Sequence, residues 1–209
     1  MGYRGVFGQN VTEKIIEKSR FLTYVSRIES EEEARAFLSR TRAEHAGATH
    51  VCYGYIADTL GNVARYSDDG EPQGTAGLPI LGVIKAKNLV CTAAAVVRYF
   101  GGIKLGAGGL TRAYCGCAQE GLAKADIREY AACVRMTVAV NYGEVNAAMS
   151  FLERGGYGDY QKEFGESAAF TVAVREEKVS SFTAAAREYL NGRVKITEGE
   201  KIIFPFPVI

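Results

Sequence analysis

The pattern of apolar and polar residues near the start of the chain predicts two strands followed by a helix. Two stretches within residues 11–28, VTEKII and RFLTYVSRI, have strand-like composition, and the second one alternates along its length. Ser30 and Glu33 form a capping box ahead of an apolar stripe. This pattern predicts a helix that runs to about Glu44 and ends near Gly47.

The same reading continues through residue 124. The predicted elements are a strand at 50–57, a returning strand at 63–66, a polar loop at 67–77, a helix at 75–85, a strand at 89–100, a glycine-rich loop at 101–109 and a helix at 110–124. The run LVCTAAAVVRYF is mostly apolar, so we expect this strand to be buried on both faces. Small residues dominate the final helix, which predicts close packing against a sheet.

The last third of the chain repeats the alternation on a smaller scale. The predicted elements are a strand at 134–140, a helix at 143–156, a hairpin at 157–164 and 167–175, a helix at 177–192 and a strand at 194–204. The order βαββαβ is typical of the ferredoxin-like split unit. We therefore predict an α+β protein with two domains, residues 1–130 and 131–209.

Composition is that of an ordinary soluble globular chain. Of the 209 residues, 47% are hydrophobic and 23% are charged, and the formal net charge is +1. Because this charge is close to zero, any nucleic-acid site must depend on a local cluster of basic residues. No apolar stretch has the length of a signal peptide or a membrane span, which predicts a cytoplasmic location without membrane association.

The cysteines indicate reduced thiols, with no metal centre. They are odd in number and include no CxxC pair. They are Cys52, Cys91, Cys115, Cys117 and Cys133. Only His45 and His50 are available as further soft ligands, so a zinc site is a poor interpretation. We expect no metal and no cofactor.

A polar segment beginning at Arg65 is the first with candidate chemistry. It continues with Ser67, Asp68, Asp69, Glu71, Gly74 and Thr75. The three clustered carboxylates are a donor set that a divalent cation prefers. The alternative is a structural turn, because Asp-Asp-Gly followed by Glu-Pro is typical of turns. We favour the turn, with this loop as polar support for the segment described next.

A glycine-rich segment after the buried strand is the second candidate. Glycines let backbone amides approach a ligand, and a helix start adds unpaired donors and a positive dipole end. The predicted phosphate or nucleic-acid site consists of Arg65, Arg98, Tyr99, Phe100, Gly101, Gly102, Lys104, Gly106, Gly108, Gly109 and Arg112. The two rings are expected to stack on a base. The alternative is that the glycines serve packing and the arginines pair with the nearby carboxylates.

Four stretches resemble the Impact/YigZ family, both in sequence and in their order along the chain. They are KSRFLTYVSRI, ATHVCYGY, RYSDDGEPQGTAGLPIL and VVRYFGGIKLGAGGLTRAY, and they span residues 18–114. The βαββαβ unit resembles the small second domain of the bacterial members. One departure is Cys115-Gly-Cys117, where relatives carry Ser and other small residues.

The resemblance implies a fold and a role. It implies an N-terminal domain like the second domain of ribosomal protein S5, and a ferredoxin-like C-terminal domain like domain V of elongation factor G. Eukaryotic relatives regulate translation through protein partners. We therefore expect a translation-associated regulatory protein that binds RNA or the ribosome, or a protein partner of the translation machinery, and that is not an enzyme.

Two other functions stay open. An enzyme acting on a phosphorylated small molecule or nucleotide predicts a deep pocket walled by Asp68, Glu71 and Arg98. A protein-interaction adaptor predicts an exposed apolar patch on the C-terminal sheet. The candidates for that patch are Val138, Val140, Phe170 and Val172.

Overall fold

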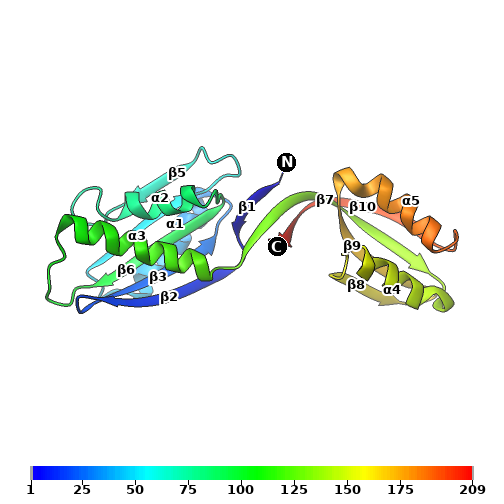
Figure 1. Ribbon diagram of the computed structural model, residues 1–209, viewed down its shortest axis with the longest axis horizontal. Coiled ribbons are helices and arrows are strands. Elements are labelled where there is room, and N and C mark those ends of the chain that lie inside the picture. Colours follow the sequence, from blue (N-terminus) through cyan, green and yellow to red (C-terminus); the bar gives the residue numbers. More distant parts are fainter. Residues whose placement is uncertain (1, 209) are drawn as a thin grey trace. The chain divides into compact units, whose positions relative to one another are not determined.

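The computed structural model describes residues 2–208, which form two compact units (Figure 1). Apart from short terminal segments, one unit comprises Tyr3–Glu129 and the other comprises Tyr130–Phe206. Each unit combines helices with a β-sheet and has its own hydrophobic core. The sequence predicted an α+β protein, and its combination of helices with antiparallel sheets is confirmed.

The sheet of the N-terminal unit has five strands in the order β2-β3-β6-β4-β5. The strands are β2 (Gln9–Ile16), β3 (Ser19–Arg27), β4 (His50–Ile56), β5 (Ala64–Ser67) and β6 (Thr92–Tyr99). All neighbouring pairs are antiparallel. The central strand β6 is buried along almost its whole length, which confirms the expectation of burial on both faces. A short strand β1 (Tyr3–Val6) precedes this sheet and was not expected.

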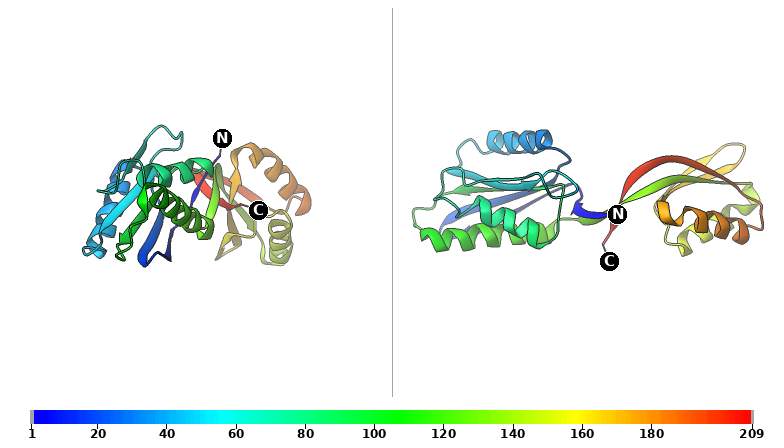
Figure 2. Two further views of the ribbon diagram at one scale, coloured as in Figure 1. Left: turned by 60° about the vertical axis from the view of Figure 1, so that its left-hand side comes forward. Right: turned by 90° about the horizontal axis from the view of Figure 1, so that it is seen from above.

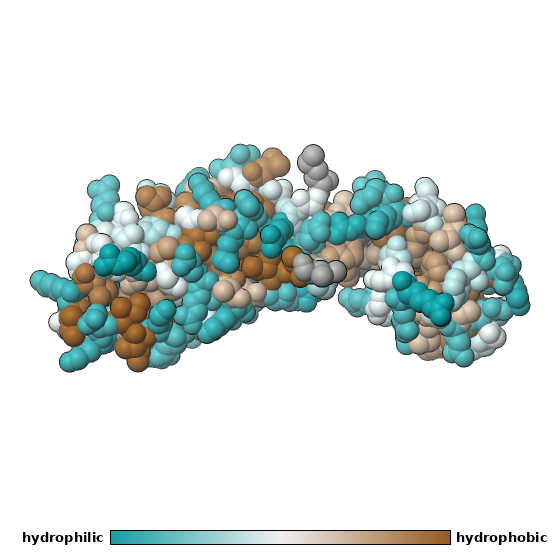
Figure 3. Space-filling model, viewed as in Figure 1, coloured by the Kyte–Doolittle hydropathy of each residue, from teal (hydrophilic) through white to brown (hydrophobic). Residues whose placement is uncertain are grey.

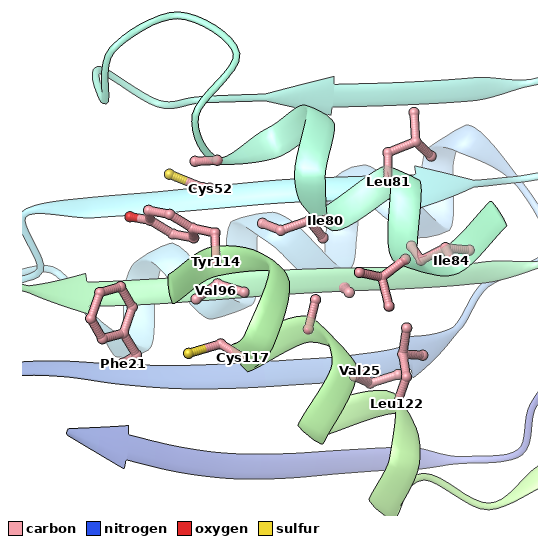
Figure 4. Packing of buried hydrophobic residues seen from close by; sticks show 14 of the residues in the cluster. Phe21, Val25, Cys52, Ile80, Leu81, Ile84, Val96, Tyr114, Cys117 and Leu122 are labelled. Atoms are coloured by element: carbon pink, nitrogen blue, oxygen red, sulfur yellow. The ribbon is translucent and has the colours of Figure 1, made fainter. Parts of the chain in front are cut away.

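Three helices cover the two faces of this sheet. Helix α1 (Glu31–Glu44) lies on one face, whereas α2 (Gly77–Ala86) and α3 (Gly106–Lys124) lie on the other (Figure 2). Side chains from α2 and α3 interlock over the strands, among them Ile80 and Tyr114 (Figure 4). The layers place the start of α3 at the end of the sheet where β6 finishes.

The caps explain where these helices begin. The Glu33 backbone N–H donates to Ser30 Oγ at 3.1 Å, so the predicted N-cap of α1 is confirmed. Helix α3 begins at Gly106, four residues before the predicted start at Leu110. The prediction was wrong because glycine has low intrinsic helix propensity, and here the packing of the following residues outweighs that preference.

The C-terminal unit has the element order βαββαβ that the sequence predicts. The elements are β7 (Ile127–Val140), α4 (Val145–Arg154), β8 (Tyr160–Phe164), β9 (Ala168–Arg175), α5 (Val179–Tyr189) and β10 (Lys195–Pro207). One-turn 3₁₀ segments at Tyr142–Glu144 and Glu176–Lys178 precede the two helices. The strand order is β8-β9-β7-β10. Strand β7 starts seven residues earlier than predicted.

The apolar patch expected on the C-terminal sheet is absent from the surface that the structure describes. The four candidate residues, Val138, Val140, Phe170 and Val172, are buried. They pack with residues of α4 and α5, including Phe151 and Phe182, in the core of the unit. That expectation was wrong because alternation identifies an apolar face without indicating whether helices cover it.

Apolar surface instead gathers at the end of the N-terminal unit where α3 begins (Figure 3). Phe100 and Ile103 are among the exposed apolar side chains of this region. None of the helices between residues 2 and 208 combines the length and apolar character of a membrane span.

Candidate functional site

A buried ion pair between Glu71 and Arg98 organises this end of the N-terminal unit. Arg98 Nη1 lies 2.6 Å from Glu71 Oε1, and the same oxygen accepts a hydrogen bond from the Tyr114 hydroxyl at 2.8 Å. The side chains of Arg98 and Glu71 are only 6% and 4% exposed. Arg98 Nη2 donates to Ser19 Oγ at 3.3 Å, whereas Nε has no hydrogen-bond partner in the described part of the chain.

The position of Arg98 follows from the sheet. It lies near the end of β6, opposite His50 on β4 and Phe21 on β3. Its guanidinium carbon lies 5.5 Å from the ring centre of Phe21 and 5.4 Å from that of Phe100, within cation–π range. Arg98 is therefore not the free surface cation that the predicted phosphate site requires, because Glu71 neutralises it. This is the pairing that the sequence left as an alternative.

Asp68 caps helix α2. Its Oδ1 accepts from the backbone N–H groups of Ala76 and Gly77 at 3.0 and 2.8 Å, and its Oδ2 accepts from Gly74 at 2.8 Å. Burial acts to raise the pKa of this carboxyl, but the three backbone hydrogen bonds outweigh it and the pKa is lowered. The side chain therefore has a structural role at the helix start.

Asp69 fastens the turn to the sheet. Its carboxylate accepts from the Val51 backbone N–H at 2.7 Å and from Arg42 Nη2 at 2.8 Å. Ser67 Oγ accepts from the Asp69 backbone N–H at 3.1 Å, and Thr75 Oγ1 donates to the Pro72 carbonyl at 2.6 Å. The turn interpretation of this segment is confirmed, and residues 2–208 bring together no group of three or more His, Cys, Asp or Glu side chains suited to a metal ion.

The first amides of the glycine-rich segment are tied inward. The Phe100 N–H donates to Thr49 Oγ1 at 3.0 Å, and the Gly101 N–H donates to Ser19 Oγ at 3.2 Å. A Cβ at Gly101 would overlap the backbone carbonyl of Lys18. Gly101 therefore serves close packing, and its predicted role as an amide facing a ligand was wrong.

The start of α3 remains open. Its N-cap residue, Leu105, makes no side-chain capping bond, so the N–H groups of the first turn lack the acceptor that a cap would supply. Gly102 and Gly106 adopt φ angles of 87° and 69°, and a Cβ at either would meet no atom within 4 Å. Gly108 and Gly109 belong to the same first turn. The backbone here is accessible to a ligand.

Two exposed cations flank this helix start. Lys104 and Arg112 make no ion pair with any residue between 2 and 208. Arg112 Nη1 lies 3.5 Å from the position that a Cβ on Gly108 would occupy, so the guanidinium is beside the first turn. The structure thus brings together the predicted residues Lys104, Gly106 and Arg112, and with them Gly108 and Gly109.

Arg65 and Tyr99 do not belong to this group. Arg65 lies opposite Tyr55 on β4 and pairs with Glu31 of α1 at 3.3 Å. Arg98 lies opposite His50, which is five residues from Tyr55 along β4. At about 3.4 Å per residue, the two arginines are therefore roughly 17 Å apart along the sheet. The Tyr99 hydroxyl bonds to His45 Nδ1 at 2.9 Å, among the residues that pack with α1. The prediction for Arg65 was wrong because the strand register places it far from Arg98 along β4. The prediction for Tyr99 was wrong because neighbouring residues of a strand point to opposite faces.

A pocket of about 360 Å³ lies between the ion pair and the start of α3. Glu71, Arg98, Lys104 and Gly106 contribute to it. The sequence missed its other lining residues, which include Thr49, His50, Pro72, Leu105, Ala107 and Leu110. The cross-strand pairing of His50 with Arg98 would have identified one of them, but no register was predicted. A second hollow of about 490 Å³ adjoins Lys104 and Arg112.

The cysteines are all free, as the sequence predicts. Burial raises the pKa of Cys52 to about 12 and that of Cys117 to about 11. Burial also raises the pKa values of Cys91 and Cys133. Cys115 is half-buried and lines a shallow groove between α2 and α3. None of the four buried thiols is a ready nucleophile, because the thiolate is the reactive form.

Comparison with known proteins places the chain in a family. The Impact N-terminal domain matches residues 17–122. The IMPACT family member YvyE of Bacillus subtilis is 38% identical over 90% of this chain and 87% of its own length. The chain belongs to the IMPACT family. Another IMPACT family member, YigZ of Escherichia coli, is 31% identical over 87% of this chain and 90% of its own length.

One solved structure supports the same fold. A crystal structure of a hypothetical protein aligns with this IMPACT family chain at a TM-score of 0.62 and 29% identity, covering 95% of this chain and 98% of the other. The two-domain translational regulator Yih1 aligns over 56% of this chain and 46% of its own at 23% identity, with a TM-score of 0.38. The TM-score of the Yih1 alignment is too low for any conclusion about this chain.

Proposed function

We propose that this IMPACT family protein is a cytoplasmic, translation-associated regulator that binds RNA, free or in the ribosome, through phosphate contacts at the start of α3. The family resemblance supplies the link to translation, and it also supports a protein partner in the translation machinery. The observation that supports phosphate binding is the uncapped start of a 19-residue helix, flanked by Lys104 and Arg112, which form no ion pair within residues 2–208.

The proposal includes the identity of the two domains. Residues 1–130 correspond to a domain like the second domain of ribosomal protein S5, and residues 131–209 to a ferredoxin-like domain. The element order βαββαβ and the strand order β8-β9-β7-β10 support the second assignment. The fold alone is a weak argument for function, so the RNA proposal depends on the site.

The site suits a phosphate for physical reasons. Backbone N–H groups at a helix start point outward, and the helix dipole adds a partial positive charge there. Lys104 and Arg112 supply two full charges that no carboxylate within residues 2–208 neutralises by an ion pair. Contacts of this kind recognise the nucleic-acid backbone and carry little sequence information.

Salt dependence gives the test. Two phosphate contacts to single-stranded RNA predict that log K falls against log salt with a slope of about −1.4, since each contact contributes about −0.7. Fluorescence anisotropy with a labelled single-stranded RNA between about 50 and 200 mM salt measures this slope.

The double variant Lys104→Glu/Arg112→Glu should reduce RNA affinity at least about tenfold and flatten the salt dependence. Arg35→Glu/Arg40→Glu is the charge-matched control, because both residues are exposed on α1, on the other face of the sheet. Equal loss in the two double variants, or no binding by the wild-type protein, would contradict the proposal.

An enzyme acting on a phosphorylated small molecule is the second candidate. The pocket that contains Glu71 and Arg98 favours it. Against it, Glu71 Oε1 is already engaged by Arg98 and Tyr114, and Asp68 caps α2 and does not line this pocket. The geometry therefore supports a binding site better than a general base.

A further inference from the structure

The pocket between the Glu71–Arg98 pair and the start of α3 has two chemically different ends. Towards α3 it contains Lys104, Gly106 and Ala107, where a cation and the start of a helix without a side-chain cap favour an anion. The rest of its wall is largely apolar and includes Pro72, Phe100, Leu105 and Leu110. A ligand that fits both ends carries a negative group on a flat, largely apolar body.

Phe100 points to the nature of that body. The residue is 46% exposed although it follows the most buried strand of the sheet. Its backbone N–H donates to Thr49 Oγ1, and both residues line the pocket. An exposed aromatic ring at the edge of a pocket is a stacking surface for a nucleobase.

Buried polar groups form the inner wall of the pocket. Glu71 Oε1 is saturated by Arg98 and Tyr114, whereas Oε2 has His50 Nε2 at 3.9 Å, beyond hydrogen-bond distance. Arg98 is more than nine-tenths buried, lines the pocket, and leaves Nε without a partner among residues 2–208. A buried polar group without a partner is uncommon in native proteins, and a functional role is one explanation for it.

We infer that this pocket receives a single nucleotide unit, with its phosphate at the start of α3 and its base against the exposed ring of Phe100. A volume of about 360 Å³ is at the lower end of the range for small-ligand sites and accommodates one nucleotide but not two stacked ones. The inference deepens the proposed function and rests on it for the source of the ligand. The nucleotide is either free or an unpaired nucleotide of an RNA.

Calorimetric titration of the full-length protein with AMP, adenosine and inorganic phosphate tests the inference directly. AMP should bind at least tenfold more tightly than adenosine or phosphate, because only AMP occupies both ends of the pocket. Ala107→Leu fills the pocket without changing charge, so it should weaken AMP binding at least tenfold. Ala123→Leu is the matched control, an exposed alanine near the other end of α3, and should leave AMP binding unchanged.

An Ala107→Leu variant that binds AMP as tightly as the wild-type protein would overturn the inference, as would AMP that binds no better than phosphate. Circular dichroism melts of both variants check that they are folded. A six-nucleotide RNA then identifies the source: loss of RNA affinity in Ala107→Leu indicates an unpaired nucleotide, and unchanged RNA affinity indicates a free one.

The same titrations separate this inference from the proposed function. Salt-dependent RNA binding with no AMP binding refutes the nucleotide pocket and leaves phosphate-backbone recognition intact. AMP binding that needs the pocket, with no RNA binding, supports the pocket and refutes the RNA proposal.

Discussion

Replacing Glu71 with leucine should strongly destabilise the N-terminal unit. The substitution leaves the Arg98 guanidinium, which is 6% exposed, without the carboxylate that lies 2.6 Å away. Breaking a buried ion pair from one side costs about 3–5 kcal/mol, because the remaining charge stays buried and unpaired. Ser19 Oγ and the two flanking rings keep Arg98 in place, so it cannot easily turn to water.

The double variant Glu71→Leu/Arg98→Met separates the ion pair from the packing. It removes both charges and keeps apolar volume, so the cost of the unpaired charge disappears. The Tyr114 hydroxyl still loses its bond to Glu71, which leaves a cost of about 1–3 kcal/mol. The double variant should therefore be more stable than Glu71→Leu alone, by about 2 kcal/mol.

Native-state hydrogen exchange is the appropriate assay because the chain has two units. Amides of β6 report the N-terminal unit, and amides of β9 serve as an internal reference. If Glu71→Leu alone unfolds the N-terminal unit, the amides of β6 should lose protection in that variant and regain it in the double variant. A cost below about 1 kcal/mol for Glu71→Leu, or a double variant less stable than the single one, would refute the reasoning.

Further predictions concern the turn and the glycines. The pKa of Asp68 is lower in the folded protein than its unfolded value near 3.8, so the stability that its carboxylate contributes is complete above pH 3.8. This contribution is lost as the pH falls through the lower folded pKa. The stability of Asp68→Asn should therefore depend less on pH below about 3.8 in acid unfolding. Gly101→Ala should cost about 1–3 kcal/mol in urea unfolding, because its methyl group would meet the Lys18 backbone. Gly116→Ala, in α3 with open space around it, should instead gain about 0.5–1 kcal/mol, and similar effects at both glycines would contradict this account.

Local pattern predicted most elements because each is stabilised by its own periodicity or cap. The capping box at Ser30 and the apolar run ending at Arg98 fall in this class. Helix α3 started earlier than predicted because the propensity of its glycines is a weak preference, which the packing of Leu110 and Tyr114 overrides.

The site was only half predictable, because it depends on which residues meet across the sheet. Proximity in sequence suggested that Arg65 acts with the polar turn, whereas strand register carries it to the far end of β4. The Glu71–Arg98 contact joins residues 27 positions apart and follows from the position of Arg98 opposite His50. The sequence alone could not decide whether the arginines bind a phosphate or pair with nearby carboxylates, because ion pairing depends on which side chains are close in space.

The distribution of thiols has a practical consequence for spectroscopy. The chain contains no tryptophan, so it lacks the usual intrinsic fluorophore. Of the five cysteines, only Cys115 is not buried, and the other four have pKa values raised by burial. A maleimide dye would therefore attach selectively to Cys115, on the same helix whose first turn faces the pocket. The wild-type chain thus provides a native labelling position for following ligand binding, without an engineered cysteine.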